Sequence, residues 1–507
     1  MDPPTAAKAL QLLQTTGIAA LVFAAYALWP TMRRTLQLAK IPNMSEFGTG
    51  EKYRQTFLSS ARMIYEKGYA RFNDCCYALL NEDGVPTVII PPSLLPELRK
   101  LPDDVVDFQE AIRGIMEVAH THLDTGSSTS ITTIKANLTP ALTRLNPTIC
   151  NEVDAALRQG MPPCEDWTQV NIYEKLVLLV AKVSGRIFVG PETCQDPEYL
   201  DTACSYTLDL MNAVTALKKM RPWLKPFLGS RTPEVIKLRQ REKLAEKVLR
   251  PLIEERINSK ANDPNWQEPD DLLQWMLNKS NGNDSVEQLI GYQLSIIFGA
   301  VHTTTTTATN ILYTLATTPE YIEPLRDEIR NVLAANDGVI TSRALQQMEK
   351  LDSYMKEVMR FNPPLMTSFT RYAKKGFSLS NGQYIPQGVM IEVPSSAIYR
   401  DETFYPSADR FDGYRSYKQC ASGKAQDIAR NQFVTTNETN LAFGYGRHAC
   451  PGRFFATNEI KMVLARLLLQ YDIKMPNGET ERYPQIEHGK QCGPDATKML
   501  SFKRVEV

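Results

Sequence analysis

The first strong pattern along the chain is an apolar segment close to its N-terminus. No charged residue lies between Lys8 and Arg33, and residues 9–29 are predominantly apolar. About twenty such residues are what a helix needs to cross a bilayer. Pro30 follows this segment and is predicted to end the helix, because proline lacks a backbone N–H. The pattern therefore predicts one membrane-spanning helix at the start of the chain.

The charges after this segment predict its orientation. Arg33, Arg34 and Lys40 follow the apolar residues, and basic residues mark the cytosolic flank of a membrane helix. A cleaved signal peptide is the alternative interpretation, although its basic region would hold only Lys8 and its apolar region would be long. We expect residues 1–40 to be a single-pass anchor in the endoplasmic reticulum membrane, with the rest of the chain in the cytosol.

Further along, the pattern alternates between short strands and helices. Residues 87–90 predict a strand that ends at two prolines. Residues 285–318 form a long segment without proline, apolar at its centre, and Pro319 follows it, which predicts a buried helix. The pair Asn381-Gly382 lies between alternating stretches and predicts a hairpin, with another strand at residues 389–393. The outline is a mainly α fold with small β-sheets (α+β).

Composition narrows the function classes. The chain has 507 residues, of which 43% are hydrophobic and 22% charged, and its 57 basic and 57 acidic residues balance. This balance argues against nucleic acid as a partner, because nucleic-acid binding needs a basic face. Nine scattered cysteines argue against a disulfide framework and against a structural metal site. No stretch has linker composition, so residues 41–507 are expected to form one large catalytic domain.

The most specific motif surrounds Cys450. Residues 443–452 form a glycine-rich loop that leads into a predicted helix, with Pro451 suited to the first helical position. Unpaired N–H groups and the positive end of a helix dipole are expected to favour the thiolate form of Cys450. An isolated cysteine is usually a buried structural residue. The surrounding glycines and aromatic residues favour instead a thiolate that binds haem iron.

This loop resembles the haem-binding loop of the cytochrome P-450 monooxygenases. The family pattern is matched at Phe443, Gly446, Cys450 and Gly452, whereas His448 stands where the family usually has arginine. The resemblance implies the cytochrome P-450 fold and haem b, with Cys450 as the axial ligand of its iron. It also implies that His448 contacts a haem propionate, and that Phe443, Gly444 and Gly452 surround the cofactor.

A second resemblance lies on the predicted long helix. Gly299, Ala300, His302 and Thr303 are similar to the oxygen-activating segment of the family, with His302 in place of the usual acid and Ala300 in place of a second glycine. The Thr303 hydroxyl can bond the carbonyl four residues earlier and loosen the helix. The resemblance implies that Thr303 and His302 are catalytic and relay protons to bound dioxygen, beside which Ala300 leaves room. The threonines that follow are expected only to pack.

A third motif is structural. Glu357 and Arg360 lie three residues apart on one face of a predicted helix, and an aromatic segment with Arg415 follows further along the chain. The order resembles the family's buried charge triad, which implies that Arg415 completes it, with Arg410 as the less favoured substitute. Elsewhere, an isolated pair of this kind would be a solvated surface pair.

Two further predictions concern the propionates of the haem. Arg371 stands where relatives place a propionate donor, although an exposed loop arginine is an equal alternative. The tryptophan–arginine helix of the family, another propionate contact, is not found in this sequence, and Lys135 or Arg144 could replace it.

Together these resemblances imply a monooxygenase of the type found in filamentous-fungal secondary metabolism. No nucleotide-binding glycine motif is present, so electrons from NADPH are expected to arrive through a separate NADPH-cytochrome P-450 reductase. The alternatives are a reductase-independent haem-thiolate isomerase or dehydratase, and a non-enzymatic membrane haem-binding protein. The presence of Thr303 argues against both.

The substrate is expected to be a lipophilic small molecule, of terpenoid, steroid or polyketide type. Residues 218–227 mix basic and bulky apolar side chains, as in a loop that dips into a membrane surface, although a connection between two helices is an equal possibility. The residues expected to line the pocket are Ala300, Leu365, Met366, Ser368 and Phe369.

Overall fold

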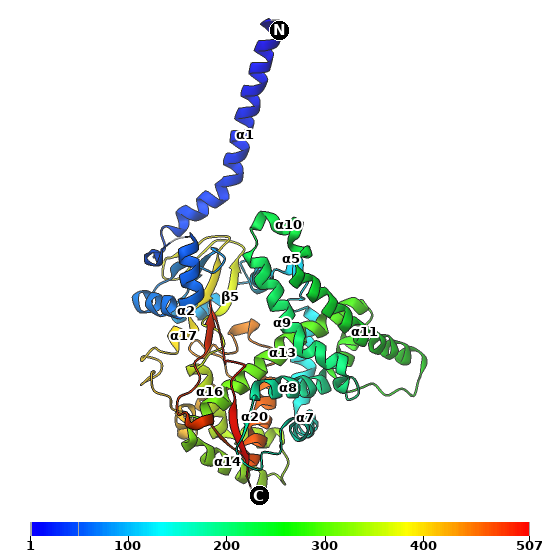
Figure 1. Cartoon of the computed structure of the whole chain (residues 1–507). Helices are drawn as coiled ribbons and strands as arrows, with labels where there is room; N and C mark the ends of the chain where they lie inside the picture. Colours follow the sequence, from blue (N-terminus) through cyan, green and yellow to red (C-terminus); the bar gives the residue numbers. More distant parts are fainter. Residues whose placement is uncertain (1–2, 49, 506–507) are drawn as a thin grey trace.

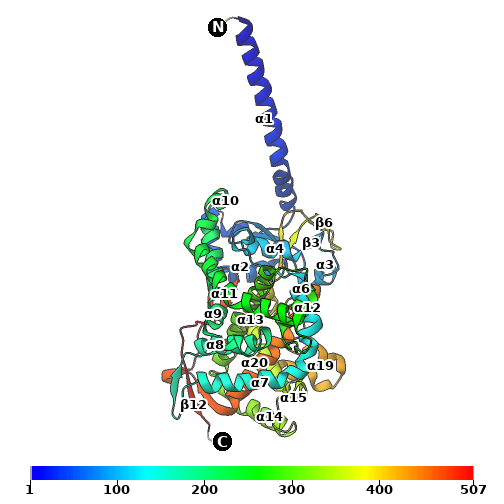
Figure 2. The ribbon, with the colours of Figure 1, turned by 90° about the vertical axis from the view of Figure 1, so that its right-hand side faces the viewer.

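The N-terminal helix projects away from the rest of the molecule (Figures 1 and 2). The computed structural model describes residues 3–48 and 50–505. Within helix α1 (Pro3–Leu38), Gln11–Leu38 is an exposed apolar stretch with a mean hydropathy of 1.6, long enough to cross a membrane. Pro30 lies inside this helix, so the prediction that it ends there is wrong. An exposed helix tolerates the loss of one backbone hydrogen bond at proline.

Helices make up most of the domain. After α1 they are α2 (Gly50–Phe72), α3 (Leu95–Leu98), α4 (Phe108–Ile115), α5 (Val118–Thr121), α6 (Ser128–Thr133), α7 (Thr139–Gly160), α8 (Ile172–Phe188), α9 (Pro197–Lys219), α10 (Lys225–Leu228), α11 (Pro233–Asn262), α12 (Leu272–Ser280), α13 (Val286–Leu315), α14 (Ile322–Ala334), α15 (Ser342–Gln347), α16 (Glu349–Phe361), α17 (Ser395–Ile398), α18 (Arg415–Gln419), α19 (Ala425–Asn431) and α20 (Arg453–Gln470).

The strands form small sheets. They are β1 (Tyr77–Leu80), β2 (Pro86–Ile89), β3 (Val106–Asp107), β4 (Thr168–Val170), β5 (Ser368–Ala373), β6 (Phe377–Ser378), β7 (Tyr384–Ile385), β8 (Met390–Val393), β9 (Tyr471–Lys474), β10 (Ile486–His488), β11 (Gln491–Gly493) and β12 (Leu500–Arg504). The largest sheet has the order β1-β2-β8-β5-β3, in which only β2 and β8 run parallel. A second sheet has the order β4-β12-β9.

The predicted elements are present. The long helix is α13, whose N-cap Ser285 forms a capping box with Gln288. The predicted hairpin is the β6–β7 pair, with Gly382 at a φ of +83° between its strands. The strands predicted at residues 87–90 and 389–393 are β2 and β8. The fold is therefore mainly helical with small sheets, as expected.

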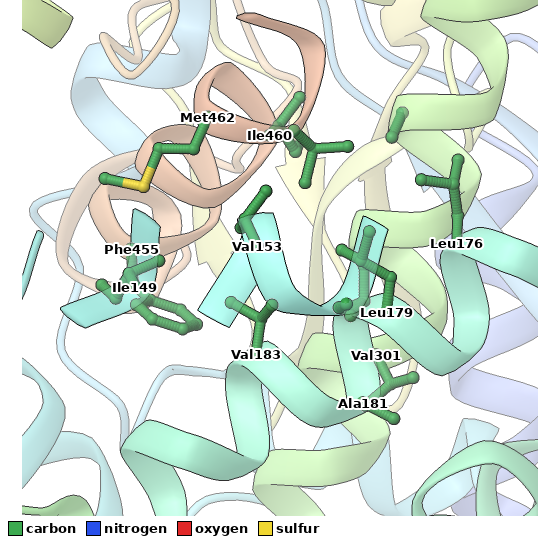
Figure 3. Packing of buried hydrophobic residues seen from close by; sticks show 14 of the residues in the cluster. Ile149, Val153, Leu176, Leu179, Ala181, Val183, Val301, Phe455, Ile460 and Met462 are labelled. Atoms are coloured by element: carbon green, nitrogen blue, oxygen red, sulfur yellow. The ribbon is translucent and has the colours of Figure 1, made fainter. Parts of the chain in front are cut away.

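The main core forms where α7, α8, α13 and α20 meet. Figure 3 shows Val153 of α7, Val183 of α8, Val301 of α13 and Phe455 of α20 in this core. All four side chains are buried. This packing fixes α13 against α20, the helix that begins directly after the Cys450 loop. The two segments that carry the predicted chemistry thus belong to one rigid framework.

Candidate functional site

The Cys450 loop is held by its own backbone. The N–H of Cys450 donates to the Phe443 carbonyl at 2.8 Å, and the N–H of Gly444 donates to the Leu441 carbonyl at 2.9 Å. Gly444 has a φ of +76° and Gly446 a φ of +72°, a region that side chains with a Cβ rarely adopt. Gly444 and Gly446 are therefore required by the turn itself.

Helix α20 begins later than the sequence predicts. Its first residue is Arg453 and its N-cap is Gly452, so Pro451 precedes the helix and does not occupy its first position. The prediction for Pro451 is wrong. The loop turn continues through Pro451, and the first N–H groups of the helix follow Cys450 closely enough to hydrogen-bond its sulfur.

The thiol of Cys450 retains accessible surface although protein surrounds it on most sides. Burial raises the pKa of Cys450, whereas the backbone N–H groups of Gly452 and Arg453 and the charge of Arg453 lower it. Burial has the larger effect, so the net pKa of Cys450 is raised, although the backbone N–H groups at the helix terminus act in the predicted direction. A bound metal ion would deprotonate such a thiol outright.

The central turn of α13 also opens toward free space. Gly299 and Thr303, four residues apart on one face, are exposed, whereas Val301 and His302 between them and Thr304 after them are buried. The Thr303 hydroxyl donates to the Gly299 carbonyl at 2.8 Å, as predicted. A Cβ added at Gly299 would have no neighbour within 4 Å. Exposed positions at the middle of an otherwise buried helix mark a space that a ligand can fill.

His302 points to the other side of α13. Its Nε2 lies 2.8 Å from the Cys204 carbonyl on α9, and its Nδ1 lies 3.2 Å from the Tyr173 hydroxyl on α8. The residue is only 8% exposed, and burial lowers the pKa of His302, partly offset by the hydrogen bond to Cys204. His302 and Thr303 are thus neighbours in sequence that face different surroundings.

A cationic cluster lies beside the Cys450 loop. The Arg371 guanidinium on β5 stacks over the Phe369 ring at 4.2 Å and over the Phe108 ring at 5.2 Å. His448 stacks on Phe108 as well, with ring centroids 5.3 Å apart. His448 Nε2 contacts a carboxylate oxygen of Asp103 at 3.1 Å. The two predicted propionate contacts therefore meet around one aromatic ring.

Arg371 is buried without a direct ion pair. It is 5% exposed, and its hydrogen bond within the described residues goes to the Thr370 carbonyl. Burial, followed by the charge of Arg447, lowers the pKa of Arg371 to about 10, while the negative charges of Asp103 and Asp107 act in the opposite direction. Among the residues that the structure describes, no carboxylate pairs with Arg371. This excludes the exposed-loop alternative for Arg371 and points to an anionic ligand, because an unpaired buried charge is costly.

The structure separates the two candidates for the remaining propionate contact. Arg144 makes a bidentate pair with Asp270, at 2.9 and 2.6 Å, so its guanidinium already has an anionic partner. Lys135 lies in a π-helical turn, and its Nζ donates to the carbonyl of Arg447 in the Cys450 loop at 3.2 Å. Only Lys135 of this pair therefore lies beside the predicted cofactor site.

The predicted charge triad is assembled. Arg360 makes a bidentate pair with Glu357 at 2.8 and 2.7 Å, and Arg415 Nε reaches Glu357 at 3.2 Å. Arg360 also donates to the Tyr399 carbonyl, and the Tyr399 hydroxyl accepts the N–H of Leu441 at the start of the Cys450 loop. The triad thus supports the loop through Tyr399.

The predicted pocket residues divide into two groups. Ala300 and Ser368 are half-buried and Leu365 is exposed, so these three have surface for a ligand. Met366 is fully buried against α2, and Phe369 packs in the core with a φ of +53°. Met366 therefore does not line an open pocket, which corrects the prediction for it. Phe369 lines a small cavity together with Arg371 and His448.

These residues fit a haem. The buried guanidinium of Arg371 needs an anion, Cys450 offers an accessible sulfur, and Gly299 and Thr303 open onto free space. Asp103, Phe108 and Tyr173 were missed by sequence reasoning, because they belong to no motif and reach the site only through the fold.

The fold and the site together fit a haem-thiolate oxygenase, and the N-terminal apolar helix is compatible with a membrane anchor. Comparisons with known proteins agree. The family model "Cytochrome P-450" matches residues 118–498. The chain belongs to the cytochrome P-450 family, and it is a monooxygenase of that family.

Its relatives are fungal enzymes. The chain is 36% identical to the cytochrome P-450 monooxygenase TES1 of Alternaria alternata over 96% of this chain and 93% of that one. It is 39% identical to the monooxygenase ATR3 of Stachybotrys chlorohalonatus, over 83% and 89% of the two chains. It is 33% identical to an ent-kaurene oxidase of Gibberella fujikuroi, over 90% and 92%.

Proposed function

We propose that this monooxygenase oxidises a lipophilic small molecule, of terpenoid, steroid or polyketide type, with electrons from a separate NADPH-dependent reductase. The observation that carries the proposal is the accessible Cys450 thiol in a loop whose neighbour Arg371 is buried without an anion. The similarity to an ent-kaurene oxidase supports a lipophilic substrate.

Each residue has a defined task in this proposal. Haem, when bound, would supply the activation of dioxygen. Cys450 would hold its iron, while Arg371, His448 and Lys135 would hold its propionates. The Thr303 hydroxyl, at the exposed face of α13, would hold and deliver a proton, whereas His302 on the same helical turn faces Cys204 and Tyr173.

Membrane attachment supports the choice of substrate. The turn at Pro222–Leu224 and helix α10 expose Trp223 and Phe227, which are 64% and 70% accessible. Both views place α10 on the side of the domain from which α1 leaves (Figures 1 and 2). Bulky apolar side chains with neighbouring basic residues suit a membrane surface. We propose that the chain is anchored in the endoplasmic reticulum membrane, with its domain in the cytosol and substrate arriving from the bilayer.

The test is turnover with a purified reductase. The holoenzyme in lipid nanodiscs is incubated with NADPH, dioxygen and NADPH-cytochrome P-450 reductase, after ligands are found by their spectral shift of the haem. We expect oxygenated product only when both reductase and NADPH are present. Product formed from a peroxide without reductase would identify an isomerase or dehydratase instead. Spectral binding without any product would leave only a haem-binding protein.

A further inference from the structure

The hydrogen bonds of His302 determine which of its nitrogens carries the proton. Nε2 lies 2.8 Å from the Cys204 carbonyl oxygen, and a carbonyl oxygen can only accept. Nε2 must therefore be protonated. Burial lowers the pKa of His302, so the imidazole is neutral near neutral pH and its Nδ1 is an acceptor. The Tyr173 hydroxyl, 3.2 Å away, then donates to Nδ1.

This arrangement leads protons away from the site. A proton that passed from Tyr173 through the imidazole would emerge at Nε2, which faces the amide carbonyl of Cys204. An amide carbonyl does not take up a proton near neutral pH, so the path ends there. Thr303, on the exposed face of the helix, donates to the Gly299 carbonyl, whereas the hydrogen bonds of His302 go to Cys204 and Tyr173.

The same contacts hold three helices together. The imidazole of His302 on α13 bonds Tyr173 of α8 and Cys204 of α9. His302 thus ties α13 to both neighbouring helices at the residue that directly precedes Thr303.

We propose that Tyr173 is a positioning residue of the oxygen side. It holds His302 as the neutral Nε2–H tautomer, and this link fixes the turn of α13 that presents Thr303. His302 acts by hydrogen bonding and does not relay protons to the oxygen side. The proposal rests on the proposed function only in taking Thr303 as the group that delivers protons. It assigns a role to Tyr173, and it accounts for a histidine where the family has an acid.

Substitutions at position 302 separate the two roles. In His302→Gln, the amide N–H₂ can still donate to Cys204 and the amide oxygen can accept from Tyr173, but the side chain does not titrate. We expect this variant to stay within about twofold of wild type in product formed per NADPH, with an unchanged pH profile. Tyr173→Phe, which removes one hydrogen bond, should lose about fivefold, the factor that one hydrogen bond of ordinary strength supplies, and His302→Ala, which removes two, should lose at least as much. Tyr206→Phe, which removes the same atom from a buried tyrosine of α9 outside this network, should be unchanged. Equal losses in His302→Gln and His302→Ala would overturn the proposal in favour of a proton relay.

A second measurement does not depend on turnover. The chain has five histidines, so protein labelled with ¹⁵N-histidine gives few imidazole signals, and those of His302 are assigned by their loss in His302→Gln. In the diamagnetic reduced CO complex we expect a neutral imidazole with its proton on Nε2. In Tyr173→Phe the Nδ1 signal should shift toward that of a nitrogen without a donor. A charged ring, a proton on Nδ1, or no response to Tyr173→Phe would overturn the proposal. Failure of the proposed function would appear separately, as an absence of product from the wild-type enzyme.

Discussion

The Cys450 loop and the central turn of α13 both need glycine, but for different physical reasons. Gly444 has a φ of +76°, and a Cβ there would lie 3.5 Å from the Cα of Ala449. Gly299 is helical, and a Cβ there would meet nothing within 4 Å. The loop depends on a backbone conformation, whereas α13 depends on empty space. Substitutions should therefore damage the fold on the loop side and the chemistry on the α13 side.

The largest effect is expected where the loop is supported. Glu357→Gln removes the anion that pairs with two arginines, and breaking a buried pair costs about 3–5 kcal/mol. The Cys450 loop should loosen first, because Arg360 reaches it through Tyr399. Thermal unfolding and haem retention measure this loss. The exposed Glu320→Gln should match wild type; an unchanged melting temperature in Glu357→Gln would contradict the role of the triad.

The two glycines allow a direct comparison. Gly444→Ala should destabilise the protein by about 1–3 kcal/mol, because alanine is strained at positive φ. Gly299→Ala should stabilise α13 by up to about 1 kcal/mol, the difference in helix propensity, while its methyl group narrows the oxygen side. Chemical denaturation measures both variants. Equal destabilisation by the two substitutions would erase the distinction between the regions.

Substitution of Arg371 tests whether this buried cation binds an anionic ligand beside the Cys450 loop. In Arg371→Leu, the protein without haem should be more stable by about 1–3 kcal/mol, because a buried cation without a partner has been removed. The same variant should lose haem faster than wild type. Differential scanning fluorimetry of the haem-free protein and haem transfer to apomyoglobin measure the two effects. Loss of stability without faster haem loss would show that Arg371 only packs; the exposed Arg113→Leu is the control.

The smallest effect on stability is expected on the oxygen side. Thr303→Ala should keep the fold and haem but lower product per NADPH by about tenfold or more, with electrons lost to peroxide. Thr307→Ala removes the same hydroxyl from a buried position of α13, where it donates to the Thr303 carbonyl at 2.9 Å. Peroxide release and NADPH consumption distinguish the variants. If Thr307→Ala loses as much product per NADPH as Thr303→Ala does, Thr303 acts only through helix packing.

The sequence predicted those features that depend on local pattern. The capping box of α13, the β6–β7 turn and the glycines of the Cys450 loop follow from neighbouring residues. The predictions for Pro30 and Pro451 failed because helix α1 continues through Pro30, and because α20 begins only after Pro451. The order of the motifs allowed the triad to be assigned, although its geometry is set by tertiary packing.

The sequence could not show which distant segments of the chain contact one another. The partners of His302 lie 98 and 129 residues away, on helices that carry no motif. The burial of Arg371 and its stacking on Phe108 depend on how β5 packs against α4. The raised pKa of Cys450 likewise follows from burial, which outweighs the local effect of the helix terminus.

The most direct test of the whole account is the absorption spectrum of the reduced CO complex. Wild type should show the long-wavelength Soret band that a thiolate ligand gives, and Cys450→Ser should lose it completely. Cys420→Ser, at a half-buried cysteine in another segment, should keep the band. A band that survives in Cys450→Ser would contradict the assignment of Cys450 as the ligand of the haem iron.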